Sequence, residues 1–159
     1  MTATGNDSVG STVRAIVAGH ADQRGALLPI LHAIQEELGH VPPDAVPVLA
    51  QELNLSRADV HGVLTFYRDF REAPPGRTTV RICRAEACQA QGADVLVGTA
   101  ERETGLALGQ TAPSGALTVE AVFCLGNCAL GPSVTVNGRL CGRVDTDQLR
   151  AILGEAMTS

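Results

Sequence analysis

Two stretches of the chain decide the fold, and they read VRICRAEAC at residues 80–88 and VFCLGNC at residues 122–128. Each begins as an alternating, strand-like run and continues into a short loop that carries two thiols. The four thiols belong to Cys83, Cys88, Cys124 and Cys128. The spacings are C-x4-C and C-x3-C, so the two sulfur atoms of each loop can turn onto one metal atom, and the 35 residues between the loops predict a folded unit there.

Four thiolates divided two and two match the needs of a [2Fe–2S] cluster. Its two tetrahedral irons share bridging sulfides, so each iron still requires two protein ligands. Zinc also binds four thiolates, but structural zinc motifs usually set their cysteines closer together, most often as C-x2-C. Disulfide bonding is disfavoured because the cysteine count is odd, at five, and no secretory segment is evident. The residues therefore favour an iron–sulfur centre and leave zinc as the alternative.

Composition narrows the class of protein further. Of the 159 residues, 45% are apolar but only 3% are aromatic, so we expect an interior built from Ala, Val, Leu and Ile. The net charge of −5 opposes nucleic-acid binding, which needs a basic face that displaces counterions. No run approaches the roughly 18 consecutive apolar residues of a membrane helix. We expect a soluble, cytoplasmic protein without membrane insertion, in a reducing compartment that keeps thiols free.

The first half of the chain predicts a helical bundle. Residues 1–11 are small, polar and glycine-containing, and we expect them to form a disordered tail. Beyond them, apolar residues recur at helical spacing between glycine and proline breaks. The expected helices cover residues 12–18, 27–38, 44–53 and 56–70, with Gly39 ending the second, Asp44 capping the third and a Ser56–Asp59 capping box opening the fourth.

The third and fourth of these helices also resemble a helix-turn-helix DNA reader. Charge argues against that function, because in residues 51–72 acidic side chains outnumber the three Arg and there is no Lys. We therefore expect the bundle to pack on itself or on a partner subunit.

The second half predicts a small sheet with helices. The Ala-Pro-Pro-Gly segment at residues 73–76 suits neither helix nor strand and predicts a domain boundary. The expected elements beyond it are strands at 78–82 and 117–123, a helix at 89–104, a turn-rich stretch at 106–115, an Asn-Gly hairpin of 134–136 with 139–141, and a last helix that Asp145 caps. Strands and helices in this order, after an all-helical segment, predict an α+β chain.

The chain resembles the thioredoxin-like [2Fe–2S] ferredoxin family. The resemblance rests on both cysteine stretches and on LPILHAIQ at residues 28–35 and VHGVLTFY at residues 60–67. The family includes the small iron–sulfur subunit of respiratory complex I, its counterpart in NAD-reducing hydrogenases and the gamma subunit of NAD-dependent formate dehydrogenases. The sequences CRAEACQ and FCLGNCA are most similar to those of the formate dehydrogenase gamma subunit. The resemblance implies an N-terminal helical bundle over residues 12–73 and a thioredoxin-like α/β domain with a small mixed sheet over residues 77–159.

The resemblance also implies a site and partners. Cys83 and Cys88 would hold one iron of a [2Fe–2S] cluster, and Cys124 and Cys128 the other. The chain would carry single electrons without being catalytic itself. It shows no glycine-rich dinucleotide loop, so FMN and NAD are expected on a flavin- and NAD(H)-binding partner subunit, beside a larger iron–sulfur and molybdenum catalytic subunit. The alternatives are the equivalent subunit of complex I or of an NAD-reducing hydrogenase, or a zinc-stabilised interaction module.

Several other side chains carry expectations of their own. Cys141, on the second arm of the hairpin, is expected to be a small buried hydrophobe, because free cysteine is often buried. Loop N–H groups are expected to point at the cluster, with Gly126 and Gly131 allowing close approach. Arg81 and Arg84 lie beside the site in the sequence. Their charges would either raise the reduction potential of the cluster or belong to ordinary solvated surface side chains. The four histidines, which we do not expect to be ligands, are His20, His32, His40 and His61.

Overall fold

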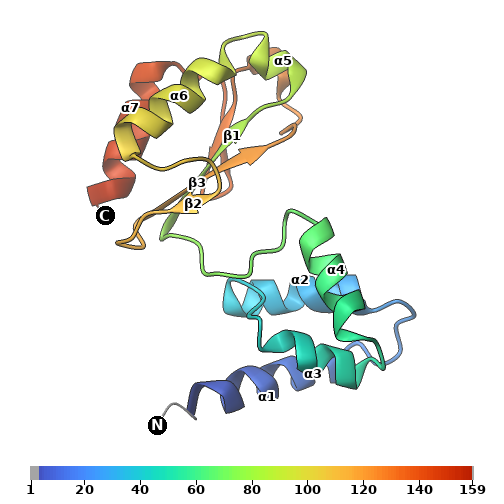
Figure 1. Cartoon of the computed structure of the whole chain (residues 1–159). Helices are drawn as coiled ribbons and strands as arrows, with labels where there is room; N and C mark the ends of the chain where they lie inside the picture. Colours follow the sequence, from blue (N-terminus) through green and yellow to red (C-terminus); the bar gives the residue numbers. More distant parts are fainter. Residues whose placement is uncertain (1–3, 159) are drawn as a thin grey trace. The chain divides into compact units, whose positions relative to one another are not determined.

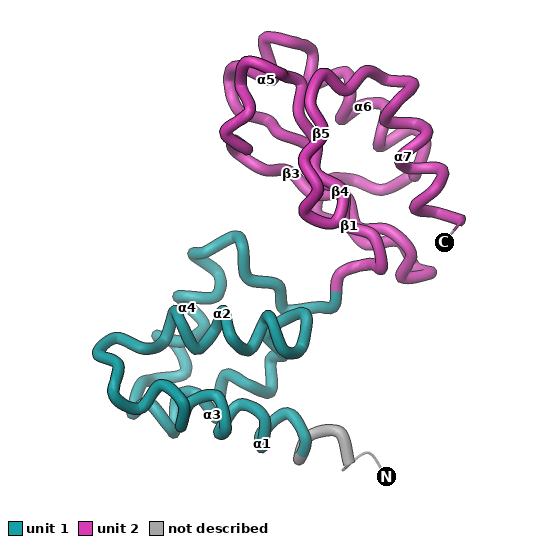
Figure 2. The backbone as a smooth tube through the Cα atoms, turned by 180° about the vertical axis from the view of Figure 1, so that it is seen from behind, with its two compact units in different colours: residues 1–74 teal, residues 75–159 magenta. Residues whose placement is uncertain are grey.

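The structure, a computed structural model, describes residues 4–158. The chain divides into two compact units between Pro74 and Pro75, shown in two colours in Figure 2. Unit 1 ends at Pro74 and unit 2 begins at Pro75, so the division falls inside the Ala-Pro-Pro-Gly segment. Within the described residues, no helix is both long and apolar enough to cross a membrane.

Unit 1 consists of helices around an aliphatic core. Its helices are α1 (Thr4–Ala18), α2 (Leu27–Leu38), α3 (Ala45–Glu52) and α4 (Arg57–Phe66) (Figure 1). Each helix contributes one buried apolar stripe to the core, as with Ile30 and Ile34 of α2 and Leu49 of α3. The capping box at the start of α4 is confirmed, because Ser56 Oγ accepts from Asp59 N at 3.0 Å and Asp59 Oδ2 accepts from Ser56 N at 3.2 Å.

Three helix expectations in unit 1 need correction. Helix α1 begins at Thr4, so a disordered tail is wrong for residues 4–11, while residues 1–3 lie outside the described residues. The cause is Val9, which lies one helical turn before Val13 and packs against the same core. Helix α4 ends at Phe66 rather than near residue 70, because Tyr67 is extended. Asp44 occupies the N-cap position of α3 but makes no capping hydrogen bond.

Unit 2 is a mixed five-stranded sheet whose strand order is β2-β3-β1-β4-β5. Strands β1 and β3 are parallel, and the other neighbouring pairs are antiparallel. The strands are β1 (Thr78–Cys83), β2 (Gln110–Thr111), β3 (Leu117–Val122), β4 (Val134–Val136) and β5 (Arg139–Cys141). The helices are α5 (Glu86–Gln89), α6 (Ala93–Thr104) and α7 (Thr146–Thr158), with the short 3-10 helix η1 (Cys128–Leu130). The expected α+β class is confirmed.

The core of unit 2 lies between the sheet and two helices. Helices α6 and α7 run side by side in Figure 1 and contribute Leu96, Leu149 and Leu153 to one buried cluster. The strands contribute Val80 and Ile82 of β1, with further aliphatic residues of β3 and β4. This packing holds the strands rigidly, and therefore fixes the points at which β1 and β3 end.

Two expectations in unit 2 also need correction. The helix expected at residues 89–104 begins only at Ala93, as α6, because Gln89 ends the separate helix α5 and the chain then turns through Gly92, whose φ of 95° is left-handed. The turn-rich stretch contains β2, a two-residue edge strand paired with β3. The Asn-Gly hairpin is confirmed, with φ of 48° at Asn137 and 82° at Gly138.

Candidate metal centre

The parallel pairing of β1 with β3 brings the two cysteine stretches together. In this pair Cys83 lies opposite Val122, so both strands end at the same edge of the sheet. Two loops leave that edge, which we name the first cysteine loop (residues 83–88) and the second cysteine loop (residues 124–128). The sheet topology thus places four thiols, distant in sequence, at one location.

The first cysteine loop is buried and regular. Cys83 is the last residue of β1 and Cys88 lies in α5, and each is only 2% exposed. Both thiols pack against Ala93 at the start of α6. The turn between strand and helix is closed by a hydrogen bond of 2.9 Å from Cys88 N to Ala85 O. Regular structure on both sides therefore fixes this pair.

The second cysteine loop is exposed and relies on left-handed backbone. Cys124 and Cys128 are both exposed. Cys124 has a φ of 88° and Gly126 a φ of 73°. A non-glycine residue in this region costs about 1–3 kcal/mol, and such residues cluster at functional sites. The second cysteine loop therefore contains a turn with left-handed backbone directly after β3.

The two thiols of each loop influence each other's ionisation. Cys83 and Cys88 form one such pair, and Cys124 and Cys128 form the other. Burial raises the pKa of Cys88 first, and the hydrogen bond with Cys83 raises it further. The hydrogen bond with Cys124 and the charge of that thiol raise the pKa of Cys128. Between the loops the influence is by charge, since Cys128 raises the pKa of Cys88 and Cys83 raises the pKa of Cys128. The thiols are therefore arranged two and two.

Backbone N–H groups point at the sulfur atoms, as the sequence predicted. Burial pushes the pKa of Cys83 upward, but hydrogen bonds to its sulfur outweigh burial and bring the pKa below its usual value. The donors are the Cys88 thiol and the N–H groups of Ala85, Cys124 and Leu125. Gly126 N also lies 3.4 Å from Cys124 Sγ, and Ser133 N–H donates to Cys88. Such donors stabilise negative charge on sulfur.

The donor set fits an iron–sulfur cluster. Two thiol pairs share one edge of a rigid sheet, which supplies two ligands for each of two irons. Among the side chains that the structure describes in residues 8–158, Arg84 Nε is the one buried nitrogen or oxygen without a hydrogen-bond partner, so this N–H of the residue after Cys83 lacks an acceptor. Among the described residues, no three His, Cys, Asp or Glu side chains gather around a single metal position. A cluster in which each iron has two protein ligands does not require such a group of three.

The remaining candidates lie outside this set of four. Cys141 is half-buried rather than fully buried, because β5 is an edge strand with little cover. Arg81 Nε pairs with Glu120 Oε2 at 3.0 Å, whereas Arg84 makes only a 3.4 Å contact with Asp94 Oδ1. All four histidines belong to unit 1 and the cysteines to unit 2.

Two side chains, Gln91 and Asn127, make contacts at the site that no pattern in the sequence indicates. Gln91 Nε2 donates to Ala87 O at 2.8 Å and to Cys128 O at 3.2 Å, and so joins the two cysteine loops. Asn127 Nδ2 donates to Ser133 Oγ at 3.1 Å and so ties the second loop to the start of β4. Sequence reasoning missed both, because neither contact follows a local pattern.

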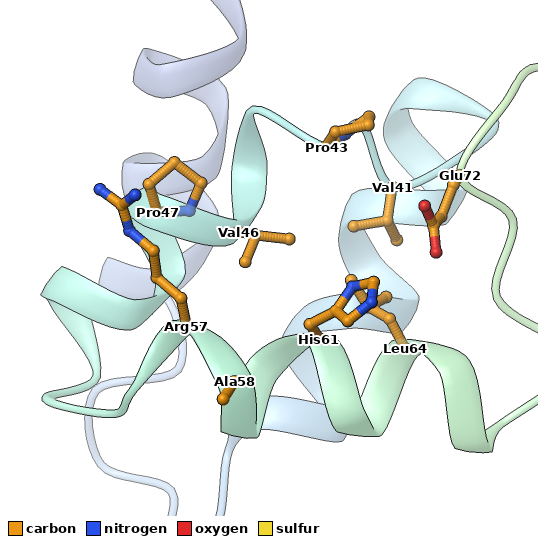
Figure 3. A pocket seen from close by; sticks show the side chains of 9 residues that line it. All are labelled: Val41, Pro43, Val46, Pro47, Arg57, Ala58, His61, Leu64 and Glu72. Carbon is orange, nitrogen blue, oxygen red and sulfur yellow. The ribbon is translucent and has the colours of Figure 1, made fainter.

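A cavity of about 430 Å³ lies in unit 1, between α3, α4 and the segment before α3 (Figure 3). In Figure 3 the side chains of Val46, His61 and Leu64 face this space, while the guanidinium of Arg57 points away from it. No cysteine lines this cavity. It is an apolar recess in the helical unit, and it shares no residue with the thiol site.

A thioredoxin-like sheet that presents two thiol pairs at one edge defines a class of iron–sulfur electron carriers. The Thioredoxin-like [2Fe-2S] ferredoxin family matches residues 13–157, nearly the whole chain. The chain therefore belongs to this family, and its cofactor is a [2Fe–2S] cluster. The expected resemblance and the expected cofactor are both confirmed.

Relatives of known assignment agree with this membership. A subunit of the NADH-quinone oxidoreductase of Pseudomonas aeruginosa is 34% identical over 134 residues, which cover 84% of this chain and 81% of that one. The HndA subunit of the NADP-reducing hydrogenase of Solidesulfovibrio fructosivorans is 31% identical over 133 residues, covering 84% and 78% respectively.

A solved structure shares the fold. The air-oxidised NAD⁺-reducing [NiFe]-hydrogenase matches with a TM-score of 0.70 at 22% identity. The match covers 84% of this chain but only 23% of the hydrogenase chain, so this chain spans about a quarter of that polypeptide's length. At this identity the likeness shows the thioredoxin-like fold alone.

Proposed function

We propose that this chain is an electron-transfer subunit in which Cys83 and Cys88 hold one iron of the cluster and Cys124 and Cys128 hold the other. The observation that carries the proposal is the parallel pairing of β1 with β3, because it brings two loops, each with two cysteines, to one edge of the sheet. When bound, the cluster supplies reversible one-electron oxidation and reduction.

The residues around the thiols have three different effects on the site. The buried first loop excludes water from its pair of thiols, because Cys83 and Cys88 are each only 2% exposed. N–H groups of both loops stabilise the negative charge that accompanies reduction. The exposed second loop, with Phe123 beside it at 66% exposure, leaves a surface at which a redox partner can approach. The chain thereby shields one side of the site and opens the other.

The partner in this proposal is a flavin- and NAD(H)-binding subunit, on which FMN and NAD would reside. In this proposal the complex is an NAD-dependent formate dehydrogenase with a larger iron–sulfur and molybdenum catalytic subunit. The support is the amino-acid sequence of the two cysteine loops, CRAEACQ and FCLGNCA. Five free cysteines suit a reducing compartment such as the cytoplasm. The relatives' names favour a second candidate, the equivalent subunit of an NADH-quinone oxidoreductase or an NAD(P)-reducing hydrogenase.

Purification of the native complex through a tag on this chain separates the two candidates. Molybdenum in the purified complex supports formate dehydrogenase, nickel supports a hydrogenase, and membrane subunits support the quinone oxidoreductase. Metal analysis of the isolated chain addresses the remaining alternative, because a zinc-stabilised module is colourless and contains no iron.

A further inference from the structure

Cys128 is the cysteine that lies farthest along the chain from the strand leading into its loop. Cys83 ends β1, Cys124 lies two residues beyond the end of β3, and Cys88 is buried within α5. Cys128, in contrast, is exposed and opens the short η1 helix at the far end of the second cysteine loop. Something besides the sheet must hold this thiol at a fixed distance from the buried pair, because two irons bridged by sulfides have one spacing.

The carboxamide of Gln91 makes that connection. Its Nε2 donates one proton to Ala87 O at 2.8 Å, directly before Cys88, and lies 3.2 Å from Cys128 O. The backbone of Gln91 is itself anchored, because its N–H donates to Cys88 O at 3.1 Å. One side chain therefore joins the residue before Cys88 to Cys128 through their backbone carbonyls.

The chain just beyond the second cysteine loop packs closely against this carboxamide. A Cβ atom added at Gly131 would lie 2.9 Å from Gln91 Nε2 and 3.2 Å from its Cδ, so only glycine fits without displacing the side chain. The glycine thus permits the approach that the hydrogen bond to Cys128 O requires. Gly131 has a φ of −70°, which alanine also adopts, so the backbone φ does not itself require glycine here.

We propose that Gln91 is a positioning residue for the cluster, which holds the second cysteine loop against the first and so sets the separation of the two thiol pairs. This inference rests on the proposed function. The N–H contacts between the loops end on sulfur atoms that irons would also engage, whereas the Gln91 contacts end on carbonyl oxygens. The link therefore does not compete with metal for the sulfur atoms. Because Gln91 is exposed, its replacement opens no cavity in the core.

Gln91→Glu tests this role with a side chain of the same length. The carboxylate has no N–H and faces two carbonyl oxygens, so it cannot make the link. Gln89→Glu is the matched control, because Gln89 is also exposed and its Nε2 donates only within the first loop, to Arg84 O at 2.7 Å. Gly131→Ala is an independent second variant, which displaces the carboxamide without changing Gln91.

The full chain is reconstituted anaerobically with iron and sulfide, and iron release to a chelator is timed. We expect Gln91→Glu and Gly131→Ala to release iron roughly three- to tenfold faster than wild type, the effect of one or two net hydrogen bonds. The EPR spectrum of the reduced cluster should shift in both variants. Because the link is also present in the chain without metal, the metal-free variants should unfold at a slightly lower temperature than wild type. Gln89→Glu, which loses a hydrogen bond only within the first cysteine loop, should match wild type in iron release and in the EPR spectrum.

Two results would overturn the inference while leaving the proposed function intact. One is a Gln91→Glu chain with wild-type iron release and a wild-type EPR spectrum. The other is an equal effect of Gln89→Glu, which would assign the change to added charge instead of the lost link. A wild-type chain that takes up no iron and sulfide would instead remove the proposed function, and the inference with it.

Discussion

The two cysteine loops hold their thiols by different means. In the first loop a strand end, a helix and the core enclose Cys83 and Cys88, which are each 2% exposed. In the second loop Cys124 and Cys128 are exposed, and the loop depends on left-handed residues and on hydrogen bonds. One half of the site is thus formed by folding, and the other half is held by a few contacts. The first cysteine loop is therefore the rigid side of the site, and the second is the side that a redox partner can approach.

The largest effect is expected from removing a thiol of either loop. Cys83→Ser and Cys128→Ser should both lose the stable cluster, because each iron needs two thiolates regardless of how buried they are. Visible absorption and iron content after anaerobic reconstitution measure this loss. Cys141→Ser is the matched control and should retain the cluster, since Cys141 lies on the edge strand β5. Equal loss in Cys141→Ser would show that the ligand assignment is wrong.

The residues that directly precede the two loops offer the next comparison. Ile82 is 0% exposed, so Ile82→Ala should lower the free energy of unfolding of the metal-free chain by about 2–5 kcal/mol. Phe123 precedes Cys124 and is 66% exposed, so Phe123→Ala should change it by about 0.5 kcal/mol or less. Urea unfolding measures both values. Similar losses in the two variants would contradict the contrast between a buried and an exposed loop.

A smaller effect is expected at the turn of the second loop. Gly126→Ala should destabilise the chain by about 1–2 kcal/mol, because its φ of 73° is unfavourable for a residue with a Cβ. Gly98→Ala in α6 is the control and should be neutral or stabilise by about 0.5–1 kcal/mol, because its new Cβ meets only the flexible end of Arg102. Thermal unfolding distinguishes them. A neutral Gly126→Ala would mean that the second loop does not need its left-handed turn.

The smallest effect concerns the potential of the cluster. Arg84→Gln should lower the midpoint potential by roughly 30–60 mV, where about 59 mV is a tenfold change for one electron, because a cation favours the more negative reduced state. Arg81→Gln is the control and should shift it less, since Glu120 already pairs with Arg81 at 3.0 Å. A redox titration followed by EPR gives both values. Equal shifts would show that the unpaired Nε of Arg84 has no particular role.

The sequence predicted those features that depend on local rules. The Asn137-Gly138 hairpin and the Ser56 capping box are each set by neighbours in the chain, and both are confirmed. It did not predict the break at Gly92, because a glycine at helical spacing looks like a weak helix residue until its φ is known. The link through Gln91 joins residues 37 positions apart and has no signature in one sequence.

The most direct test is the iron, sulfide and spin content of the full wild-type chain, purified and reconstituted without oxygen. The account predicts two irons and two acid-labile sulfides per chain, with one EPR-active unpaired electron per chain after reduction. A colourless chain that contained zinc, or that took up neither iron nor sulfide, would contradict it.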